Sequence, residues 1–285
     1  MIDYLGLNRV KPAIPLTVLL LTYNEEPNIE RTLAALRWVP SILAIDSGSS
    51  DRTLEILASE PTVSVRHRPF DTFADQCNFG LNLVRTEWVL SLDADYVVTP
   101  ALAEEICACF RAADQMQFSG FAVPFRYCIA GKPLRGTLLP PRICMYRTAG
   151  ARYRNDGHGH RVDVPGKVGR LLNPILHDDR KPLERWLASQ LGYLTIETRK
   201  LQTTPSSQLS IADRLRLNTP LAPLAALVLC LLVNGGILDG WQGWTYAFQR
   251  CYAEILLKLM LLETRAIRRD PDPKVFDQPK RLRSP

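Results

Sequence analysis

Apolar runs that each end in a polar loop recur along the first half of the chain, and they constrain its fold more than any other feature. The first run, Leu16–Leu21, leads into Thr22-Tyr23-Asn24-Glu25-Glu26. The second, Ile42–Ile45, leads into Asp46-Ser47-Gly48-Ser49-Ser50-Asp51, and Trp88–Leu92 leads into Asp93-Ala94-Asp95. Segments with helical spacing of apolar residues separate these runs. The order therefore predicts an α/β fold, with parallel strands covered by helices on both faces.

The pattern changes twice further along the chain. After Gly120 the β-like pieces are shorter and rich in Gly, Pro and Arg, which predicts that the sheet becomes mixed. From Pro182 onward the spacing is helical, over Leu183–Leu201, Leu221–Leu238 and Trp244–Leu262. We therefore expect a sheet domain over 1–181, a helical region over 182–264 and a basic, proline-bearing tail over 265–285.

The composition sets limits on the class of protein. With 285 residues and 46% hydrophobic side chains the chain can bury a sizeable core, which excludes a wholly disordered protein. The formal charge of +6 favours contact with phosphates, nucleotides or an anionic membrane surface, although we expect no nucleic-acid partner. Seven cysteines form no CxxC pair and the first fifteen residues contain no apolar signal segment, so we expect a reducing, cytoplasmic compartment.

The polar loops are expected to meet at one site, because open parallel sheets bind ligands beyond the carboxyl ends of their strands. Asp93 and Asp95 are two residues apart, so in an extended chain their carboxylates project on the same side. Mg²⁺ or Mn²⁺ can link such carboxylates to a diphosphate. A DxD pair by itself is also common in solvated turns, and its position at a strand end favours the metal site.

The three motifs in this order resemble the inverting family 2 glycosyltransferases of GT-A fold, in the bacterial branch that includes lipopolysaccharide core glucosyltransferases. The resemblance covers roughly residues 15–179 and implies a nucleotide-sugar donor, with UDP-glucose as the specific expectation. It implies that Thr22, Tyr23 and Glu25 line the nucleotide pocket and that Asp46 contacts the base. It also implies that Asp93 faces the ribose or the metal and that Asp95 is a metal ligand.

Two donor-site assignments have structural alternatives. Asp46 can instead cap the following helix, a role for which Ser49 and Ser50 are stronger candidates. Many relatives carry a basic residue around Asp75–Asn78, where this chain is polar and has no basic residue. Gln76 can still hydrogen-bond a uracil edge, and satisfying a helix N-terminus is an equally good role for it.

An inverting transfer needs a general base for the acceptor hydroxyl. Asp156, with His158 as its partner or substitute, is the favoured catalytic candidate, and Asp178 or Asp179 are alternatives. Relatives often have a His-Glu pair near this place, where this chain has Gly159-His160. Asp156 can also be a mere turn residue in a glycine-rich segment.

His177 begins a dense polar segment, His177-Asp178-Asp179-Arg180-Lys181. The resemblance implies that His177 is a further metal ligand, since members of this fold often bring a distal histidine or carboxylate to the cation. The two basic residues can hold a phosphate. A purely structural cluster of ion pairs is an equally good interpretation.

The C-terminal third carries membrane-type features. Leu221–Leu238 is apolar but contains a proline and two glycines, and it is short for a crossing, which needs about 20 apolar residues. Trp241 and Trp244 suit the headgroup level, an amphipathic segment follows, and the tail is basic. We expect peripheral or monotopic attachment at the cytoplasmic face of the inner membrane. Core helices, or contacts between the subunits of a homo-oligomer, are the alternative.

These features together lead to two functional hypotheses. The first is a metal-dependent inverting hexosyltransferase that uses a lipid-linked or cell-envelope saccharide as acceptor. The second is a catalytically idle nucleotide-sugar-binding or membrane-scaffolding protein of the same fold, which the unusual Gly159-His160 position keeps open. An oxidoreductase of Rossmann type is disfavoured, because no GxGxxG follows the first strand.

Overall fold

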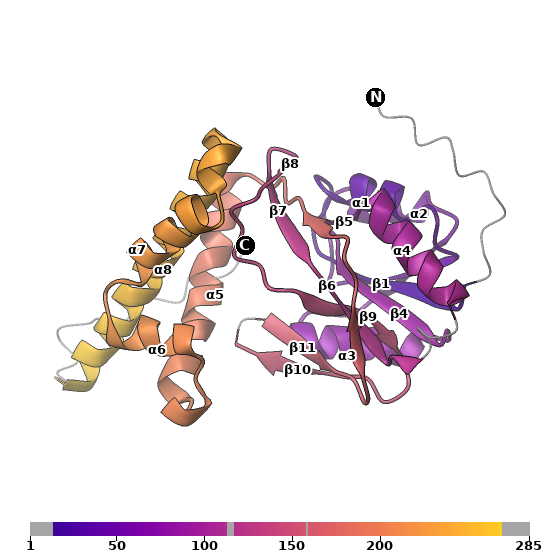
Figure 1. The fold of residues 1–285 in the computed structure, drawn as a ribbon. Coiled ribbons are helices and arrows are strands. Elements are labelled where there is room, and N and C mark those ends of the chain that lie inside the picture. Colours follow the sequence, from indigo (N-terminus) through magenta and orange to yellow (C-terminus); the bar gives the residue numbers. More distant parts are fainter. Residues whose placement is uncertain (1–13, 113–116, 158, 270–285) are drawn as a thin grey trace.

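The computed structural model describes residues 14–112, 117–157 and 159–269. In Figure 1 a sheet flanked by helices forms one part of the molecule, and long helices from the C-terminal third form a layer beside it. The mixed α/β fold with a helical C-terminal extension, as predicted from the sequence, is confirmed.

The main sheet has seven strands in the order β12-β6-β9-β4-β1-β2-β3. Strand β1 pairs in parallel with β2 and β4, whereas β9 runs antiparallel to both β4 and β6. The bounds of the strands are β1 Leu16–Thr22, β2 Ser41–Asp46, β3 Val63–His67, β4 Trp88–Asp93, β6 Gly120–Val123, β9 Arg142–Arg147 and β12 Val168–Arg170. The change from parallel to antiparallel pairing falls after Gly120, where the sequence pattern changes.

Two smaller sheets complete the β-structure. A four-stranded sheet has the order β5-β13-β7-β8, and β10 and β11 form a hairpin. Their bounds are β5 Tyr96–Val98, β7 Phe125–Ile129, β8 Lys132–Pro133, β10 Arg152–Asp156, β11 Gly159–Asp163 and β13 Ile175–His177. Because β13 pairs with β5, the segment around residue 177 is held beside the loop that follows β4.

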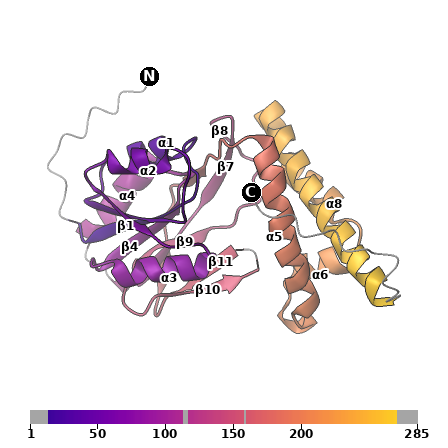
Figure 2. The ribbon, with the colours of Figure 1, turned by 180° about the vertical axis from the view of Figure 1, so that it is seen from behind.

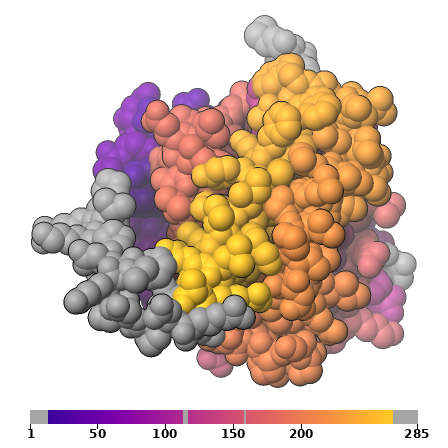
Figure 3. Space-filling model, turned by 90° about the vertical axis from the view of Figure 1, so that its left-hand side faces the viewer, coloured from indigo at the N-terminus to yellow at the C-terminus, as the bar shows by residue number. Residues whose placement is uncertain are grey.

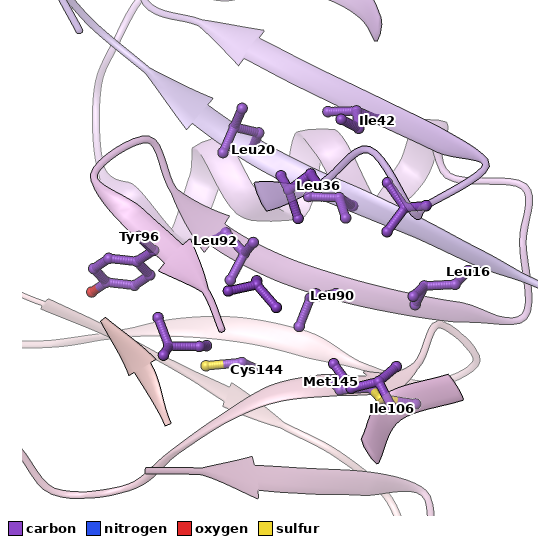
Figure 4. Close-up of a cluster of buried hydrophobic side chains, with 14 of the residues drawn as sticks. Leu16, Leu20, Leu36, Ile42, Leu90, Leu92, Tyr96, Ile106, Cys144 and Met145 are labelled. Carbon is purple, nitrogen blue, oxygen red and sulfur yellow. The ribbon is translucent and has the colours of Figure 1, made fainter. Parts of the chain in front are cut away.

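The main sheet buries side chains on both faces, which explains its continuous apolar runs. On one face Leu16, Leu20 and their neighbours pack under α1 (Ile29–Ala35), α2 (Thr53–Ala58) and α4 (Pro100–Arg111), and Figure 4 shows this cluster. On the other face Leu19 packs under α3 (Phe73–Leu83) and the β10–β11 hairpin. Neighbouring residues of β1 thus serve different cores, as the alternation of side chains along a strand requires.

Two helices of the sheet domain begin at threonine caps. The Thr72 hydroxyl accepts a hydrogen bond from the backbone N–H of Asp75 at the start of α3, and Thr99 does the same for Leu102 at the start of α4. Pro100 occupies the first turn of α4, where its missing N–H costs no helical bond. The start of α4 is therefore the one predicted from Thr99-Pro100.

The C-terminal extension consists of helices joined by short turns. Their bounds are α5 Leu183–Thr203, η2 Ser206–Gln208, α6 Ile211–Asn218, α7 Ala222–Val228, η3 Leu229–Val233, η4 Gly236–Asp239 and α8 Trp241–Arg269. Helices α5 and α8 lie side by side (Figure 2), and Leu194, Leu201, Leu257 and Leu261 are buried between them and α6. The predicted apolar stretch 221–238 is thus three short helical pieces, broken where Gly235 takes a φ of 73°.

Asp239 fastens this extension to the sheet domain. Its buried carboxylate accepts hydrogen bonds from the backbone N–H groups of Arg135, at 2.7 Å, and Gly136, at 3.3 Å. Lys132 donates to the Asp239 carbonyl at 2.8 Å. A side chain on Gly136 would collide with the backbone of η3 and η4, so a glycine is needed for this close approach.

The outward side of α7, η3, η4 and the start of α8 is strongly apolar, and Figure 3 views the molecule from the side that the C-terminal helices form. Leu232, Val233, Leu238 and Trp241 are each more than 60% exposed. The only charged residue between Arg216 and Arg250 is Asp239, which is buried. No helix within the described ranges combines the length and hydropathy that a membrane crossing requires.

Candidate active site

The loops after β1 and β2 are bound to each other at the carboxyl edge of the sheet. The backbone N–H of Asn24 donates to the Ser49 hydroxyl at 2.9 Å, and that of Glu25 donates to the Thr53 hydroxyl at 2.7 Å. In return the Asn24 side chain accepts from the backbone N–H of Ser50 at 2.7 Å. Asn24 has a φ of 51°, a left-handed value that asparagine tolerates better than most residues. These bonds hold the first two polar loops together before any ligand arrives.

Asp46 lies at the centre of this arrangement and is 1% exposed. Its carboxylate accepts from the hydroxyls of Thr22, at 2.9 Å, and Ser49, at 2.5 Å, and from the backbone N–H groups of Gly48 and Ser49. It therefore shapes both loops, and its predicted contact with the base stays a prediction. The alternative of helix capping by Asp46, Ser49 or Ser50 is not seen, since the cap residue of α2 is Arg52 and lacks a capping side-chain bond.

Asp95 and His177 meet although they are far apart in the sequence. Antiparallel pairing of β5 with β13 places His177 opposite Tyr96, and the His177 Nε2 lies 3.0 Å from the Asp95 Oδ2. Burial disfavours the charged imidazole, yet the adjacent Asp95 carboxylate raises the pKa of His177 above its usual value. Burial likewise disfavours the Asp95 carboxylate, and His177 more than offsets this and lowers its pKa.

The second oxygen of Asp95 is unsatisfied. Its Oδ1 is buried and has no hydrogen-bond partner among the described residues. A buried oxygen without a hydrogen-bond partner destabilises the folded protein unless a ligand supplies the missing contact. Asp93 lies at the end of β4 and faces the same cavity. No group of three or more His, Cys, Asp or Glu side chains suited to a metal occurs in the described part of the chain. The assignment of Asp93, Asp95 and His177 as metal ligands stays a prediction.

A second set of charged groups links the loop after β1 to the segment after β13. Glu25 and Lys181 form an ion pair, and the Asn28 amide donates to Glu25 at 2.9 Å and to Asp179 at 3.0 Å. Burial raises the pKa of Glu25 to about 7, although Lys181 opposes this rise. The predicted phosphate-binding role of Lys181 therefore competes with its place in this pair.

A cavity of about 1030 Å³ lies in front of the strand ends. Of the eight residues predicted for the donor or the metal, all but Asp46 line it, namely Thr22, Tyr23, Glu25, Gln76, Asp93, Asp95 and His177. Helices α5 and α8 supply the opposite wall, with Trp186, Tyr193, Tyr246 and Arg250 among the lining residues. The volume suits a nucleotide sugar together with part of an acceptor.

Residues 17–156, which hold the three strand-end loops, match the family model described as glycosyl transferase family 2. Residues 17–156 form a family 2 glycosyltransferase domain. His177 and the helices that close the cavity lie beyond the matched region.

Two curated relatives carry glycosyltransferase names. A lipopolysaccharide core biosynthesis glycosyltransferase of Rhizobium meliloti, LpsC, is 27% identical over 65% of this chain and 71% of its own length. An uncharacterized glycosyltransferase of Rickettsia bellii is 25% identical over 38% of this chain and 37% of its own length. The chain thus spans about a third of that Rickettsia relative.

A solved structure of S. aureus TarS, residues 1–349 in complex with UDP-GlcNAc, aligns with a TM-score of 0.49 and 12% identity. The alignment covers 88% of this chain and 91% of the TarS chain.

The predicted base lies at the far edge of the family 2 domain. Asp156 ends β10, forms ion pairs with Lys200 at 3.0 Å and Arg161 at 3.4 Å, and is not among the residues that line the cavity. The hydrogen bond from Lys200 lowers the pKa of Asp156. His158 lies outside the described residues. The catalytic assignment of Asp156 and His158 stays a prediction.

Gln76 borders the cavity of the family 2 domain but its amide is already occupied. The NH₂ group donates to the Ser47 hydroxyl at 2.8 Å and to the Arg68 carbonyl at 2.9 Å, and its oxygen accepts from the Arg68 guanidinium at 3.0 Å. Arg68 thus brings a positive charge to the place where the sequence appeared to lack one. The hydrogen bond between Gln76 and a uracil edge stays a prediction.

Sequence reasoning missed the helical wall of the cavity. Tyr127 on β7 packs against His177, with ring centroids 4.8 Å apart, and against Tyr246 of α8, at 5.1 Å. Arg250 follows one turn after Tyr246 on the same helix and also lines the cavity. The apolar spacing of α8 signals only a buried face, so no sequence signal marked Tyr127 or Arg250 as site residues.

Proposed function

We propose that the protein is a metal-dependent inverting glycosyltransferase that moves a hexose from a nucleoside diphosphate donor to a saccharide acceptor. The single observation that supports this most is the unsatisfied Asp95 oxygen beside His177, at a strand end of a family 2 domain. UDP-glucose is the proposed donor. Thr22, Tyr23 and Asp46 would hold the nucleoside, since they belong to the prearranged loops at that end of the cavity.

Asp95 and His177 would hold Mg²⁺ or Mn²⁺, and Asp93 would lie at the metal or the ribose. Carboxylate and imidazole are ligands that Mn²⁺ accepts, and Mg²⁺ favours the carboxylate with donor phosphate oxygens. When bound, the cation neutralises the charge that develops on the departing diphosphate. The Glu25–Lys181 ion pair and the bonds of Asn28 would keep the neighbouring loop in place.

In the transfer, the acceptor oxygen forms a bond to the anomeric carbon as the bond from that carbon to the diphosphate oxygen breaks. The diphosphate leaves with the electron pair, and the proton of the acceptor hydroxyl goes to the general base. Asp156 is the proposed base, with His158 as its partner. Its lowered pKa keeps it ionised at neutral pH, so it can accept a proton, but Lys200 must release it toward the cavity.

The acceptor is proposed to be a lipid-linked or cell-envelope saccharide, and the enzyme is proposed to work at the cytoplasmic face of the inner membrane. The exposed apolar side of α7, η3, η4 and the start of α8 would enter the interface of an anionic membrane. The inner side of α8 lines the cavity, so an acceptor anchored in that membrane would reach the sugar. The similarity to a protein named for lipopolysaccharide core biosynthesis supports this choice of acceptor. A second copy of the chain covering the same apolar side is the alternative.

An idle nucleotide-sugar-binding or scaffolding protein is the second candidate function. The observation that favours it is the position of Asp156, which is ion-paired and outside the lining of the cavity. Donor turnover separates the two candidates. Release of UDP from UDP-glucose with Mn²⁺, measured beside UDP-galactose, UDP-N-acetylglucosamine and GDP-mannose and stimulated by a lipid-linked saccharide extract, is expected for the enzyme. Tight UDP binding without release from any of these donors would support the idle protein.

A further inference from the structure

The cavity has two ends that differ in what they contain. At one end are the loops of Thr22 and Asp46, followed by Asp95 and then His177. Beyond His177 the order of contacts continues to Tyr127, at 4.8 Å between ring centroids, and to Tyr246 of α8, at 5.1 Å. A donor held by the strand-end loops and a metal at Asp95 fills the first end. The second end, formed by β7 and α8, is left for the acceptor.

Arg250 lies at this second end without a counter-ion. It lines the cavity, its Nε is buried, and that atom has no hydrogen-bond partner among the described residues. No carboxylate in the described ranges lies within ion-pair distance of its guanidinium. Burying a guanidinium nitrogen without a partner is costly. The atom is therefore placed for an anion that the chain itself does not supply.

The other lysine and arginine side chains that line the cavity each have a partner. Arg142 donates to the Tyr96 hydroxyl and Arg185 to the Tyr23 carbonyl, each at 3.4 Å. Lys181 pairs with Glu25, and Arg216 pairs with Glu254 at 2.7 Å. Glu254 is the residue one helical turn after Arg250 and would be its natural partner on α8, but Arg216 holds it with three hydrogen bonds. Arg250 is thus the one arginine or lysine of the cavity lining with neither a hydrogen bond nor an ion pair within the described residues.

Tyr127 adds a second donor beside Arg250. Its ring is fixed between His177 and Tyr246, and its hydroxyl has no hydrogen-bond partner within the part of the chain that the structure describes. The Tyr246 hydroxyl, by contrast, accepts from the backbone N–H of Leu138 at 3.0 Å. A guanidinium and a phenol that both line one cavity are a suitable donor pair for an oxyanion.

We propose that Arg250 and Tyr127 bind a phosphate or carboxylate group that the acceptor carries, so that the enzyme selects anionic acceptors. The inference rests on the proposed glycosyltransferase function and specifies its acceptor. In the proposed function the donor diphosphate lies at Asp95 and His177, whereas Arg250 belongs to the part of the cavity wall that α8 supplies. Arg250 also lies near Cys230 of η3, whose neighbours Leu229 and Leu232 belong to the exposed apolar side. The anion can therefore sit on the glycan or on its lipid anchor.

The test uses the full-length protein saturated with UDP and Mg²⁺, and glucose 6-phosphate as the probe, with glucose for comparison. Calorimetry is expected to show binding of glucose 6-phosphate but not of glucose. Arg250→Gln should weaken that binding by roughly tenfold or more, and Tyr127→Phe severalfold, because charge-assisted hydrogen bonds are lost. Arg199→Gln, an exposed arginine of α5 outside the cavity, is the matched control and should bind like the wild type.

UDP affinity, measured separately in each variant, distinguishes this inference from the proposed function. It should stay within about twofold of wild type in Arg250→Gln, since the donor is held elsewhere. If UDP affinity falls together with glucose 6-phosphate affinity, Arg250 serves the donor diphosphate and the inference is wrong. It is equally wrong if glucose and glucose 6-phosphate bind alike, whether or not UDP binds.

A competition experiment separates the two sources of the anion. Vesicles of phosphatidylcholine with phosphatidylglycerol are added to the complex with glucose 6-phosphate, and vesicles of phosphatidylcholine alone serve as the comparison. Displacement by the anionic vesicles only assigns the subsite to a phosphate near the lipid anchor. No displacement by either assigns it to an anion of the glycan. Displacement by both kinds of vesicle means that the membrane merely blocks the entrance, which contradicts selection of an anion.

Discussion

The strand-end loops and the C-terminal helices line one cavity, but they differ in whether their side chains find partners within the chain. In the loops, Asp46 accepts four hydrogen bonds from the chain, and Asn24 is bonded to the neighbouring loop. In the helices, an extensive apolar side and the Arg250 guanidinium have no partner within the described residues. The loops are thus prearranged by the chain itself, whereas the helices leave an apolar side and a guanidinium without a partner in the described chain.

Asp95 is the exception within the loops, and changing it should have the largest effect. Asp95→Asn removes a charged metal ligand while keeping the volume of the side chain. We expect metal-dependent UDP affinity to fall on the order of 10²-fold or more, because the charge that pairs with the cation is lost. Calorimetry with UDP and Mn²⁺ measures this, and circular dichroism checks the fold.

The matched control for that experiment is Asp163→Asn. Asp163 is an exposed carboxylate paired with Arg154 at 2.8 Å, outside the cavity. The Asp163→Asn variant should bind UDP and Mn²⁺ like the wild type. Unchanged affinity for UDP and Mn²⁺ in Asp95→Asn would show that the unsatisfied Asp95 Oδ1 is not a metal ligand. The strand-end loops would then contain no group that waits for a ligand.

Asp156 lies where the two regions touch, because its partner Lys200 belongs to α5. Asp156→Asn should leave UDP affinity near wild type while lowering turnover on the order of 10²-fold, as expected when a positioned proton acceptor is lost. Steady-state kinetics with UDP-glucose and a saturating acceptor gives both quantities. Asp156→Glu, which keeps the carboxylate, should recover part of the turnover.

Two other variants check whether the base lies elsewhere. Asp179 lines the cavity and accepts from Asn28 at 3.0 Å, and His158 is the alternative predicted from the sequence. If Asp179→Asn or His158→Ala shows the turnover defect and Asp156→Asn does not, the assignment of Asp156 is wrong and its ion pairs are structural.

Asp239 fixes the position of the helices relative to the sheet, so its removal should affect both regions. Asp239→Ala leaves the backbone N–H groups of Arg135 and Gly136 without their acceptor. We expect a loss of about 1–3 kcal/mol in the free energy of unfolding, the usual cost of buried unsatisfied groups. Denaturant unfolding measures this loss, and limited proteolysis should cleave near residue 136. A variant as stable as wild type would mean that apolar packing alone holds the extension.

The sequence predicted the sheet edge well because its signals are local. Each of the three loops follows a continuous apolar run, so Thr22, Asp46 and Asp93 could be placed at strand ends from the pattern alone. The start of α4 followed from the capping preference of Thr99. Neither step needed information from another part of the chain.

The rest of the site depends on contacts between distant segments, which periodicity does not encode. His177 reaches Asp95 only because the three residues after Asp95 form β5 and pair with β13. Both strands are three residues long, which is too short for periodicity to predict that they pair. Arg250 reaches the cavity because α8 packs against α5 and the β8 segment. The apolar spacing of α8 predicts a buried face but not which cavity its polar residues enter.

The smallest expected effect concerns the outward side of the helices, where partners come from outside the chain. We expect the protein to sediment with vesicles that contain phosphatidylglycerol, and high salt should release it only partly, because burial of apolar surface persists after charges are screened. Leu238→Glu should lower the bound fraction by roughly tenfold or more, since burying one leucine contributes about 1.5–3 kcal/mol. Leu172→Glu is the matched control, an exposed leucine of the sheet domain that should bind like wild type.

A different result would assign the apolar side to a contact between two copies of the chain. In that case the protein stays in solution with these vesicles at low salt, and its tryptophan fluorescence does not change. Sedimentation equilibrium then shows a dimer, which Leu238→Glu dissociates. The acceptor then need not be lipid-linked, because the helices that close the cavity would be completed by protein and not by a membrane.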